Sequence, residues 1–551
     1  MSCHWLLPLV LGCASAASTF PPREPLWRDP DRGSFAGPPG AYYSAHDWDR
    51  IEKTFVLPAL DVLAVRVPDE AVNVNAWDEV PDSSWFESRI GRQPLSPESL
   101  AAGPCRFGSP EPVGPWRIVS AKPDGATPGF VFQDASGQRY LAKFDGSSGS
   151  PRASLAEVLG AGLYYAAGYH VPCNAIVHFS TNGLELAPNA RAENVLGEKI
   201  ALGPEHVAKV LSHALRLPDG RYRALVSRYL EGKPLGPWRY HGLRSGDRND
   251  VVRHEDRREL RASRLLAAWT DHVDQREGNT LAMWRELAPG HGYVMHHLLD
   301  FGDCFGSIWT GSAQEVWRRG HDYWIDPRGI LQDWLTLGSR ERPWDRARLG
   351  PTGLLLGYYD VEQFDPERWR PRYPNPAFSR MTEHDAAWMA RIIARLGPHH
   401  IARILDRAAA PPELHEQLLR VLLGRRQRIL QRYLTRLSPL ADPQVRVLDG
   451  REWLCSVDLA VLSGVSPGAR LVARAWAPGD AVQSLAVRAA GRGAAEQCAR
   501  LPAAATEAGT KPQVQTVELA AELAGPAPIR FHLYRSGAHE WRVAGIERRD
   551  D

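Results

Sequence analysis

The 551-residue chain lacks a strong net charge of either sign and lacks any long hydrophobic run. It has 66 Lys and Arg against 64 Asp and Glu, which leaves a formal net charge of +2. This balance gives no reason to expect a nucleic acid or an anionic membrane surface as a partner. The N-terminal apolar run, Leu6 to Ala17, is too short to span a bilayer, and no transmembrane helix is expected further along.

Cysteine is scarce as well, and several motifs of common enzyme classes are missing. The seven cysteines form no C-x-x-C, which argues against a zinc site. Neither G-x-S-x-G nor H-E-x-x-H occurs, which argues against the hydrolases that those motifs mark. Cys455 and Cys498 fall in one predicted β domain. They could form a disulfide if the protein is exported, or they could be two buried free thiols.

The N-terminal apolar run has the size of a signal-peptide core. Val10-Leu11-Gly12-Cys13 resembles a bacterial lipobox, in which the cysteine is lipidated and becomes the mature N-terminus. An alternative cleavage point follows Ala14-Ser15-Ala16. The segment before the run carries His4 but no Lys or Arg, so a hydrophobic start on a cytoplasmic protein is the alternative. We expect export to the bacterial cell envelope, with a lipid on Cys13 as the only membrane attachment.

Composition and hydrophobic periodicity divide the chain into parts with different structure. An α+β protein is expected, with a β-rich region, then a helical region, then a β-sandwich of short strands between Gly/Pro turns. The Pro- and Gly-rich segment near the N-terminus has the composition of a flexible tether. The predicted parts are a leader (1–17), a tether (18–48), an irregular extension packed on the body (49–114), a β-rich region with one helix (115–234), a mostly helical region (235–438) and a β-sandwich (444–551).

The elements expected inside the body follow from the same patterns. The strands are Trp116 to Ser120, Phe130 to Gln133, Arg139 to Phe144, Val171 to Phe179, Ala224 to Tyr229 and Val294 to Leu299. The helices are Ser154 to Gly168, Arg257 to Asp271, Thr382 to Leu396, His399 to Ala408 and Pro412 to Leu437.

Two motifs carry the most chemical information. Residues 272–279 read H-x-D-x-x-x-x-N and contain Asp274 and Asn279, and the predicted strand that ends at Leu299 runs into Asp300-Phe301-Gly302. An Asp, an Asn five positions later and a second Asp in D-F-G are the groups that hold a substrate hydroxyl and metal ions in phosphoryl transfer. Asp271 is a rival for the acid/base role. The alternative is a polar loop that only caps the preceding helix.

A lysine and a glutamate upstream complete the set. Lys143 lies in a predicted strand among apolar neighbours, and a lysine there can reach nucleotide phosphates if it faces a cleft. Glu157 follows 14 positions later (157 − 143) on a predicted helix and can pair with Lys143. Taken singly, each has an ordinary alternative, a solvated strand lysine and a surface helix glutamate. In this order together with the two motifs they point to phosphoryl transfer.

The helix of Glu157 and the segment after it resemble a known family. Residues 157–172 read E-V-L-G-A-G-L-Y-Y-A-A-G-Y-H-V-P, which resembles the Glu-bearing helix and following strand of HipA-like kinases. More broadly, the set resembles the atypical branch of the protein-kinase-like superfamily, with the phosphoinositide, CotH-type and secretory-pathway kinases. The resemblance covers roughly residues 115 to 435 and implies a two-lobed kinase-like fold.

The resemblance also implies roles for individual residues, with ATP and Mg²⁺ (or Mn²⁺) as cofactors. Lys143 would contact the nucleotide phosphates with Glu157 as its partner, and Asp274 would be the catalytic base. Asn279 and Asp300 would hold the metal. Gly125 and Gly129 would flank a phosphate-covering loop, and the hinge that contacts adenine would be Arg228, Tyr229, Leu230 and Glu231.

The chain also departs from the kinase pattern. No G-x-G-x-x-G occurs, Val273 replaces the Arg of H-R-D, and no A-P-E follows. The separation of 21 positions between Asn279 and Asp300 (300 − 279) requires a hairpin insertion. The absence of G-x-G-x-x-G leaves open how the nucleotide phosphates would be held. Val273 in place of Arg argues against control by a phosphorylated activation loop.

The leading functional hypothesis is an ATP- and Mg²⁺-dependent transfer of phosphate to a hydroxyl of a protein or small molecule. One alternative is a pseudokinase, because free ATP is scarce outside the bacterial cytoplasm. A second is an envelope lipoprotein that acts as a scaffold and binds an envelope protein or a glycan through its β domain. Intact Asp274, Asn279 and Asp300 favour an active enzyme over the first alternative.

Overall fold

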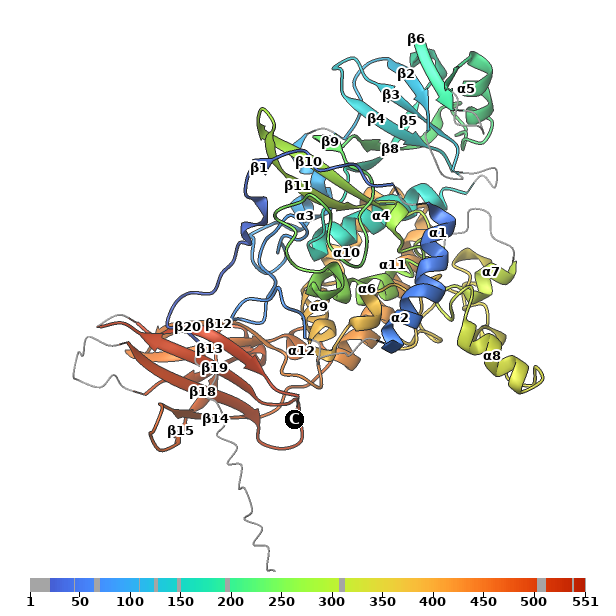
Figure 1. Cartoon of the computed structure of the whole chain (residues 1–551). Coiled ribbons are helices and arrows are strands. Elements are labelled where there is room, and N and C mark those ends of the chain that lie inside the picture. The colour runs from blue at the N-terminus through green and yellow to red at the C-terminus, as the bar shows by residue number, and fades with distance from the viewer. Residues whose placement is uncertain are drawn as a thin grey trace, which may run out of the picture.

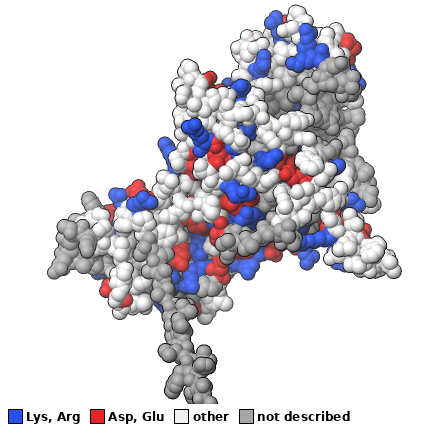
Figure 2. Space-filling view, in the orientation of Figure 1, with Lys and Arg blue, Asp and Glu red and all other residues white. Residues whose placement is uncertain are grey.

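The computed structural model describes residues 20–43, 45–63, 70–108, 110–122, 127–145, 150–193, 199–306, 313–502, 512–537 and 540–550. It is a mixed α+β structure whose β-rich region, helical body and C-terminal strands follow one another in the chain (Figure 1). The leader and its Cys13 lie outside the described residues. No helix within these ranges combines the length and apolar character that crossing a membrane requires. Figure 2 shows basic and acidic side chains interspersed on one face.

A seven-stranded sheet forms the β-rich region, in the order β5-β8-β4-β3-β2-β6-β7. Only its β2–β6 pairing is parallel, and the other pairings are antiparallel. A short helix, α5 (Pro204–Leu211), accompanies this sheet. Its strands are β2 (Trp116–Ala121), β3 (Gly129–Gln133), β4 (Arg139–Lys143), β5 (Asn174–Phe179), β6 (Leu184–Glu193), β7 (Lys199–Ala201) and β8 (Tyr222–Arg228).

Helix α4 (Arg152–Ala167) lies between this sheet and the helical body. Every residue from Ala153 to Ala167 is buried, which matches a sequence that is apolar around the whole helix. Its close packing requires glycine, because a Cβ on Gly162 would lie 2.5 Å from Ile404. The N-terminus of α4 is fixed by Asp145, which accepts hydrogen bonds from the amide of Ser154 at 2.8 Å and from its hydroxyl at 2.6 Å.

The helical body contains a four-stranded sheet and a group of packed helices. The sheet has the order β1-β11-β10-β9. The strands are β1 (Phe35–Ala36), β9 (Lys233–Pro234), β10 (Thr280–Ala288) and β11 (His291–Leu298), and the helices are α6 (Arg258–Thr270), α7 (Ala313–Arg318), α8 (Pro327–Leu335), α9 (Glu383–Arg395), α10 (Pro398–Arg407) and α11 (Pro412–Tyr433). The predicted helices are all present, and their ends differ by up to four residues.

The expectation of a flexible tether at residues 18–48 is wrong for the residues described. Strand β1 pairs antiparallel with β11, and Phe35 is buried against Trp284 with ring centroids 5.2 Å apart. The carboxylate of Asp31 accepts hydrogen bonds from the amide and the hydroxyl of Ser84. Composition alone suggested a linker, but an aromatic ring, a buried carboxylate and backbone hydrogen bonds attach this segment to the body.

The N-terminal extension, expected to be irregular, contains regular structure. Helix α1 (His46–Ile51) continues through a π-helical turn, η2 (Glu52–Val56), into α2 (Leu57–Leu63). Helix α3 (Pro97–Ala102) and the 3-10 turn η3 (Gly103–Phe107) follow. Cys105 in η3 forms a disulfide with Cys173, a pairing that the sequence analysis did not predict, and Cys304 is a buried free thiol.

Asp78 in this extension contacts arginines from three elements that are far apart in the sequence. Its carboxylate contacts Arg258 of α6, and it lies 3.2 Å from Arg391 of α9 and 3.1 Å from Arg548 of β20 (Arg542–Arg548). Burial by itself raises the pKa of Asp78, but the three guanidinium groups hold it well below its usual range. The extension therefore holds the helical body and the C-terminal strands together.

The C-terminal region consists of two antiparallel sheets, β12-β13-β17-β16 and β15-β14-β18-β19-β20. Leu454 of the first sheet and Phe531 of the second belong to one hydrophobic core. The strands are β12 (Leu440–Leu448), β13 (Arg451–Asp458), β14 (Leu471–Trp476), β15 (Gln483–Leu485), β16 (Val487–Ala489), β17 (Glu496–Arg500), β18 (Gln513–Ala521), β19 (Ile529–Arg535) and β20, with α12 (Leu459–Leu462) after β13.

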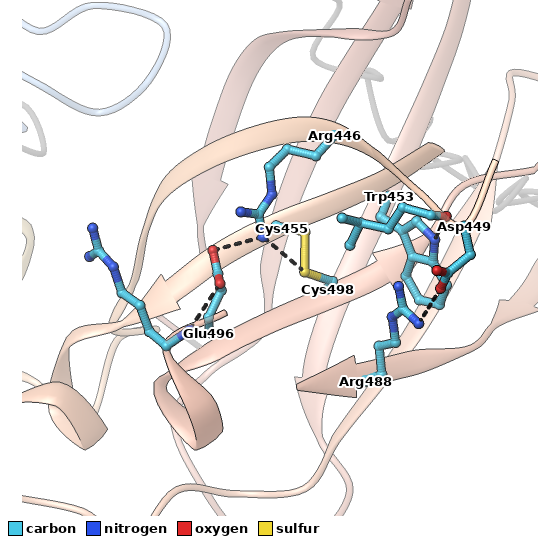
Figure 3. Close-up of a disulfide and its surroundings, with 9 residues drawn as sticks. Arg446, Asp449, Trp453, Cys455, Arg488, Glu496 and Cys498 are labelled. Carbon is cyan, nitrogen blue, oxygen red and sulfur yellow. Dashed lines mark hydrogen bonds and ion pairs between the residues drawn. A yellow bond between two sulfur atoms is a disulfide. The ribbon is translucent and has the colours of Figure 1, made fainter. Parts of the chain in front are cut away.

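Strand β13 ends at Asp458, directly before α12. That carboxylate accepts hydrogen bonds from the amides of Ala460 and Val461 and so caps α12. Cys455 and Cys498 are direct partners in the β13–β17 register and form a disulfide (Figure 3). Of the two alternatives for this cysteine pair, the structure has the disulfide.

Candidate active site

Lys143, the last residue of β4, contacts two carboxylates from other elements. Its Nζ donates a hydrogen bond to Oε1 of Glu157 on α4 and lies 2.9 Å from Oδ1 of Asp300. The Lys143 side chain is 13% exposed, and the Asp300 side chain is 49% exposed. The lysine and glutamate predicted from spacing alone therefore meet the Asp of D-F-G at the edge of a partly open site.

The charges in this trio depend on one another. Burial alone lowers the pKa of Lys143, but Asp300 and Glu157 more than offset it, so the net shift is upward. The Lys143 ammonium holds the pKa of Asp300 well below its usual range. Burial raises the pKa of Glu157, against the opposing effect of Lys143. Lys143 and Asp300 are therefore both charged at neutral pH.

The second carboxylate oxygen of Glu157 fixes the D-F-G segment. It accepts a hydrogen bond from the backbone amide of Phe301 at 3.0 Å. Phe301 is fully buried under α4, where a Cβ on Gly160 would lie 2.7 Å from the Cβ of Phe301. The ring of Phe301 also packs beside Tyr164 and His272. Glu157 therefore sets the position of Lys143 and of the backbone next to Asp300 together.

Asp274 and Asn279 are bonded to each other within the H-x-D-x-x-x-x-N loop. The Asn279 amide Nδ2 donates to the backbone oxygen of Asp274 at 2.7 Å and to its Oδ2 at 3.0 Å. Arg276 Nε also donates to Oδ2, at 3.1 Å. The other oxygen, Oδ1, is buried and accepts no hydrogen bond from any residue that the structure describes. Asp274 thus uses one carboxylate oxygen, Oδ2, for its hydrogen bonds with the described residues.

The long spacing between Asn279 and Asp300 is taken up by the β10–β11 hairpin. Thr280 is paired with Leu298 at its open end, and the amide of Leu299 donates to the backbone oxygen of Asn279 at 2.9 Å. The hairpin thereby brings Asn279 and the start of the D-F-G segment together, although Asn279 and Asp300 are 21 positions apart in the sequence. The predicted hairpin insertion is confirmed.

Asp271, the rival acid/base residue, is buried and already hydrogen-bonded to another side chain. It ends α6 with a positive φ of 55° and is 5% exposed. Its Oδ1 accepts a hydrogen bond from the indole of Trp369 at 2.9 Å. The geometry therefore favours Asp274, whose Oδ1 has no such partner.

Of the two glycines assigned to a phosphate-covering loop, Gly125 lies outside the described residues. Gly129 is the first residue of β3 and lies directly opposite Lys143 in the β3–β4 register. A Cβ on Gly129 would lie 2.3 Å from the backbone oxygen of Ala142. Glycine is needed here because the two strands approach closely beside the lysine.

The predicted hinge, Arg228 to Glu231, connects the two sheets. Arg228 ends β8 in the seven-stranded sheet, and β9 begins two residues after Glu231 in the four-stranded sheet. The amide of Tyr229 donates to the backbone oxygen of Arg139 at 3.0 Å, while its side chain is 43% exposed. Leu230 is half-buried, and Glu231 is exposed and paired with Arg285 at 2.5 Å.

Two charged residues near the site were missed by sequence reasoning. Asp303, three positions after Asp300, has its pKa raised to about 6 by burial, with like charges on Asp274 and Asp300 adding to the effect and Arg319 opposing it. Lys122, just after β2, lies close enough to help lower the pKa of Asp300. A second acid within D-F-G-D was a visible signal for Asp303, whereas nothing in the sequence marks Lys122.

The donor set suits a hard divalent cation that also has ligands from a substrate. Among the described residues no group of three or more His, Cys, Asp or Glu side chains could hold a metal ion. Because Nδ2 of Asn279 is used by Asp274, its amide oxygen is left for another partner. One amide oxygen and one carboxylate are typical of Mg²⁺ sites, in which the nucleotide phosphates and water supply the other ligands.

No protein-family model matches this chain, and no curated protein matches it. Among solved structures, the chain is similar to the Golgi casein kinase, with 11% sequence identity and a TM-score of 0.23, over 57% of this chain and 75% of that chain. A structure of the Golgi casein kinase with Mn/ADP bound gives 11% identity and a TM-score of 0.21, over 56% and 74%. TM-scores this low carry no weight for function, which is inferred below from the site alone.

Proposed function

We propose that this protein is a kinase-like phosphotransferase that moves a phosphoryl group from ATP to a hydroxyl of a protein or a small molecule. The observation that carries the proposal is the double contact of Lys143 with Glu157 and Asp300. Four segments of the chain supply these three residues and the bonded pair Asp274 and Asn279. The proposed architecture is two-lobed and kinase-like, with the site at the junction and a β-sandwich at the C-terminal end.

Each residue has a role that follows from its surroundings. Lys143 binds and neutralises the nucleotide phosphates, and Glu157 holds it in position. Asn279 and Asp300 hold Mg²⁺ or Mn²⁺ through oxygen atoms, and the bound metal neutralises phosphate charge. Asp274 orients the acceptor hydroxyl and takes its proton at the free Oδ1, because that oxygen alone of its pair has no donor.

The ion pair between Lys143 and Asp300 is compatible with this proposal. In the structure the two side chains neutralise each other at 2.9 Å. A metal–nucleotide complex offers a partner to both, phosphate to the ammonium and metal to the carboxylate. Binding of the complex therefore leaves neither charge unpaired. Nucleotide without metal would pair with Lys143 and leave Asp300 without a partner.

The two disulfides support export as the proposed localisation. Cys105–Cys173 and Cys455–Cys498 are both formed, and disulfides persist in oxidising compartments and are rare in the cytosol. We propose an exported envelope protein lipidated at Cys13, whose C-terminal sheets bind an envelope protein or a glycan. A pseudokinase or a scaffold remains the alternative, and the presence of Asp274, Asn279 and Asp300 favours the enzyme.

The test is the melting temperature of residues 18–551 with and without ATP and Mg²⁺ or Mn²⁺, beside Asp300→Ala. A ligand at 100 times its Kd stabilises a protein by about 2.7 kcal/mol, which a melting curve detects. We expect a metal-dependent rise in the wild type and none in the variant. An absent rise at millimolar ATP, or an equal rise in both proteins, would contradict the proposal.

A further inference from the structure

Among the described side chains of the helix formed by α1, η2 and α2, three polar ones are buried and several large apolar ones are exposed. Asp49, Lys53 and Thr54 are at most 3% exposed. A surface helix ordinarily buries an apolar stripe, so the burial of these three polar side chains departs from the usual pattern. The outward side chains of this helix include Trp48 (62% exposed), Ile51 (41%), Phe55 (48%) and Leu60 (55%).

The buried polar side chains of this helix contact residues 272–279, the loop that carries the candidate metal ligand Asn279 and is called the metal loop. Lys53 Nζ lies 2.7 Å from Oδ1 of Asp49 and 3.5 Å from Oε1 of Glu277. Lys53 and Glu277 are each only 1% exposed. The π-helical turn at η2 turns the consecutive residues Lys53 and Thr54 inward together. A buried ammonium requires such partners, because an unpaired one is strongly disfavoured.

Glu277 is held from its other side as well. Tyr42, also in the N-terminal segment, donates from its hydroxyl to Oε2 of Glu277 at 3.0 Å, and Arg239 Nε donates to the Tyr42 oxygen at 2.9 Å. Tyr373 donates to Oδ2 of Asp49 at 3.2 Å. Both oxygens of Glu277 therefore face groups delivered by the N-terminal segment.

Glu277 lies between the two residues that matter for chemistry. It begins the 3-10 turn η6 (Glu277–Asn279), three positions after Asp274 and two before Asn279. The hydroxyl of Thr280 donates to the backbone oxygen of Glu277 at 2.7 Å, which ties this turn to β10. Glu277 and Asn279 thus belong to one short turn, and the amide oxygen of Asn279 is the candidate metal ligand.

We propose that Lys53, supported by Asp49 and Tyr42, is a positioning residue for the metal loop. By fixing Glu277 it sets the place of Asn279 relative to Asp300, so an N-terminal helix outside the β-rich and helical regions controls metal-dependent nucleotide binding. This inference rests on the function proposed above. Lys53 does not touch the reacting atoms and acts only through Glu277.

The experiment is a calorimetric titration of ADP at a series of Mn²⁺ concentrations, for wild type and Lys53→Met. Loss of a group that orients a metal ligand typically weakens metal binding by about 10- to 100-fold. We expect the variant to need at least about tenfold more Mn²⁺ for half-maximal ADP binding, with ADP affinity in the absence of metal unchanged. Lys53→Arg keeps the charge and should restore most of the Mn²⁺ dependence, and Lys199→Met, at an exposed lysine of β7, should match the wild type.

The outcomes separate the two proposals. If wild type binds ADP without any dependence on Mn²⁺, the proposed function fails and this inference fails with it. If wild type depends on Mn²⁺ and Lys53→Met has the same midpoint, only the inference fails. If Lys53→Met does not fold, Tyr42→Phe removes a donor to Glu277 without leaving a buried charge unpaired. An unchanged Mn²⁺ midpoint in Tyr42→Phe would then overturn the inference.

Discussion

Glu157 accepts a hydrogen bond from the backbone amide of Phe301 at 3.0 Å while its other oxygen receives Lys143. One side chain therefore links β4, α4 and the D-F-G segment. Because a single carboxylate makes both contacts, a substitution that keeps its shape but removes its charge tests the two properties separately. Comparable substitutions are possible at the other residues of the site.

Glu157→Gln should weaken metal–nucleotide binding without unfolding the protein. The amide can still accept from Phe301 but cannot neutralise Lys143, so the lysine is left to Asp300. A hydrogen bond to a charged group contributes about 1.5–3 kcal/mol, which predicts a loss of at least about tenfold in affinity. Calorimetry with Mn²⁺ and ADP measures it, and Glu185→Gln on the exposed face of β6 is the control. Equal affinity in wild type and Glu157→Gln would show that the pair does not position Lys143.

Asp274→Asn should leave nucleotide binding intact and remove phosphoryl transfer. General base catalysis contributes about 10²- to 10⁴-fold, and the amide cannot take a proton. Asp271→Asn is the matched variant, since an amide oxygen can still accept from Trp369 and activity should remain near that of wild type. The assay is release of phosphate from γ-labelled ATP or labelling of an acceptor once known. Loss of activity in Asp271→Asn alone would reverse the two assignments.

Gly129→Ala should impair the nucleotide site through the backbone. Its Cβ would lie 2.3 Å from the backbone oxygen of Ala142, so β3 must shift beside Lys143. Gly183→Ala in the same region meets nothing within 4 Å and serves as the control. We expect a lower melting temperature and weaker metal–nucleotide binding only in Gly129→Ala. Wild-type behaviour of that variant would mean that β3 can move away from β4 freely.

Asp31 gives a prediction about pH. Burial raises its pKa to about 6 from the ordinary value of 3.8, against the hydrogen bonds from Ser84. A folded state that holds the proton more tightly than the unfolded state is favoured at low pH and loses this stabilisation as pH rises through about 4 to 6. Asp31→Asn removes the titration, so the melting temperature of wild type relative to the variant should fall between pH 4 and pH 7. A constant difference over that range would contradict the shifted pKa.

The sequence predicted the contacts among the candidate site residues better than the structure of the chain around them. Lys143, Glu157, Asp274, Asn279 and Asp300 each belong to a short motif or a regular element, and the length of the β10–β11 hairpin follows from one interval. These signals are local, so they can be read without knowing which segments meet. The role of Asp271 was left open because its partner, Trp369, is 98 positions away.

What the sequence did not reveal depends on contacts between distant segments. Part of the predicted tether forms strand β1 because it pairs with the edge of β11, and no local sequence pattern predicts that pairing. The helix from His46 to Leu63 was missed because its apolar side chains face outward, which reverses the usual pattern. The Cys105–Cys173 bridge joins residues 68 positions apart, and spacing alone cannot pair cysteines.

The three arginines around Asp78 make its charge balance depend on widely separated parts of the sequence. Arg548 reaches Asp78 across 470 positions of sequence, and Arg258 and Arg391 reach it across 180 and 313. Contacts of such separation are slow to form, because a long loop must close before they contribute. Asp78 has all three guanidinium partners only when the strand carrying Arg548 is present, so a chain that ends before β20 would leave this carboxylate only partly neutralised.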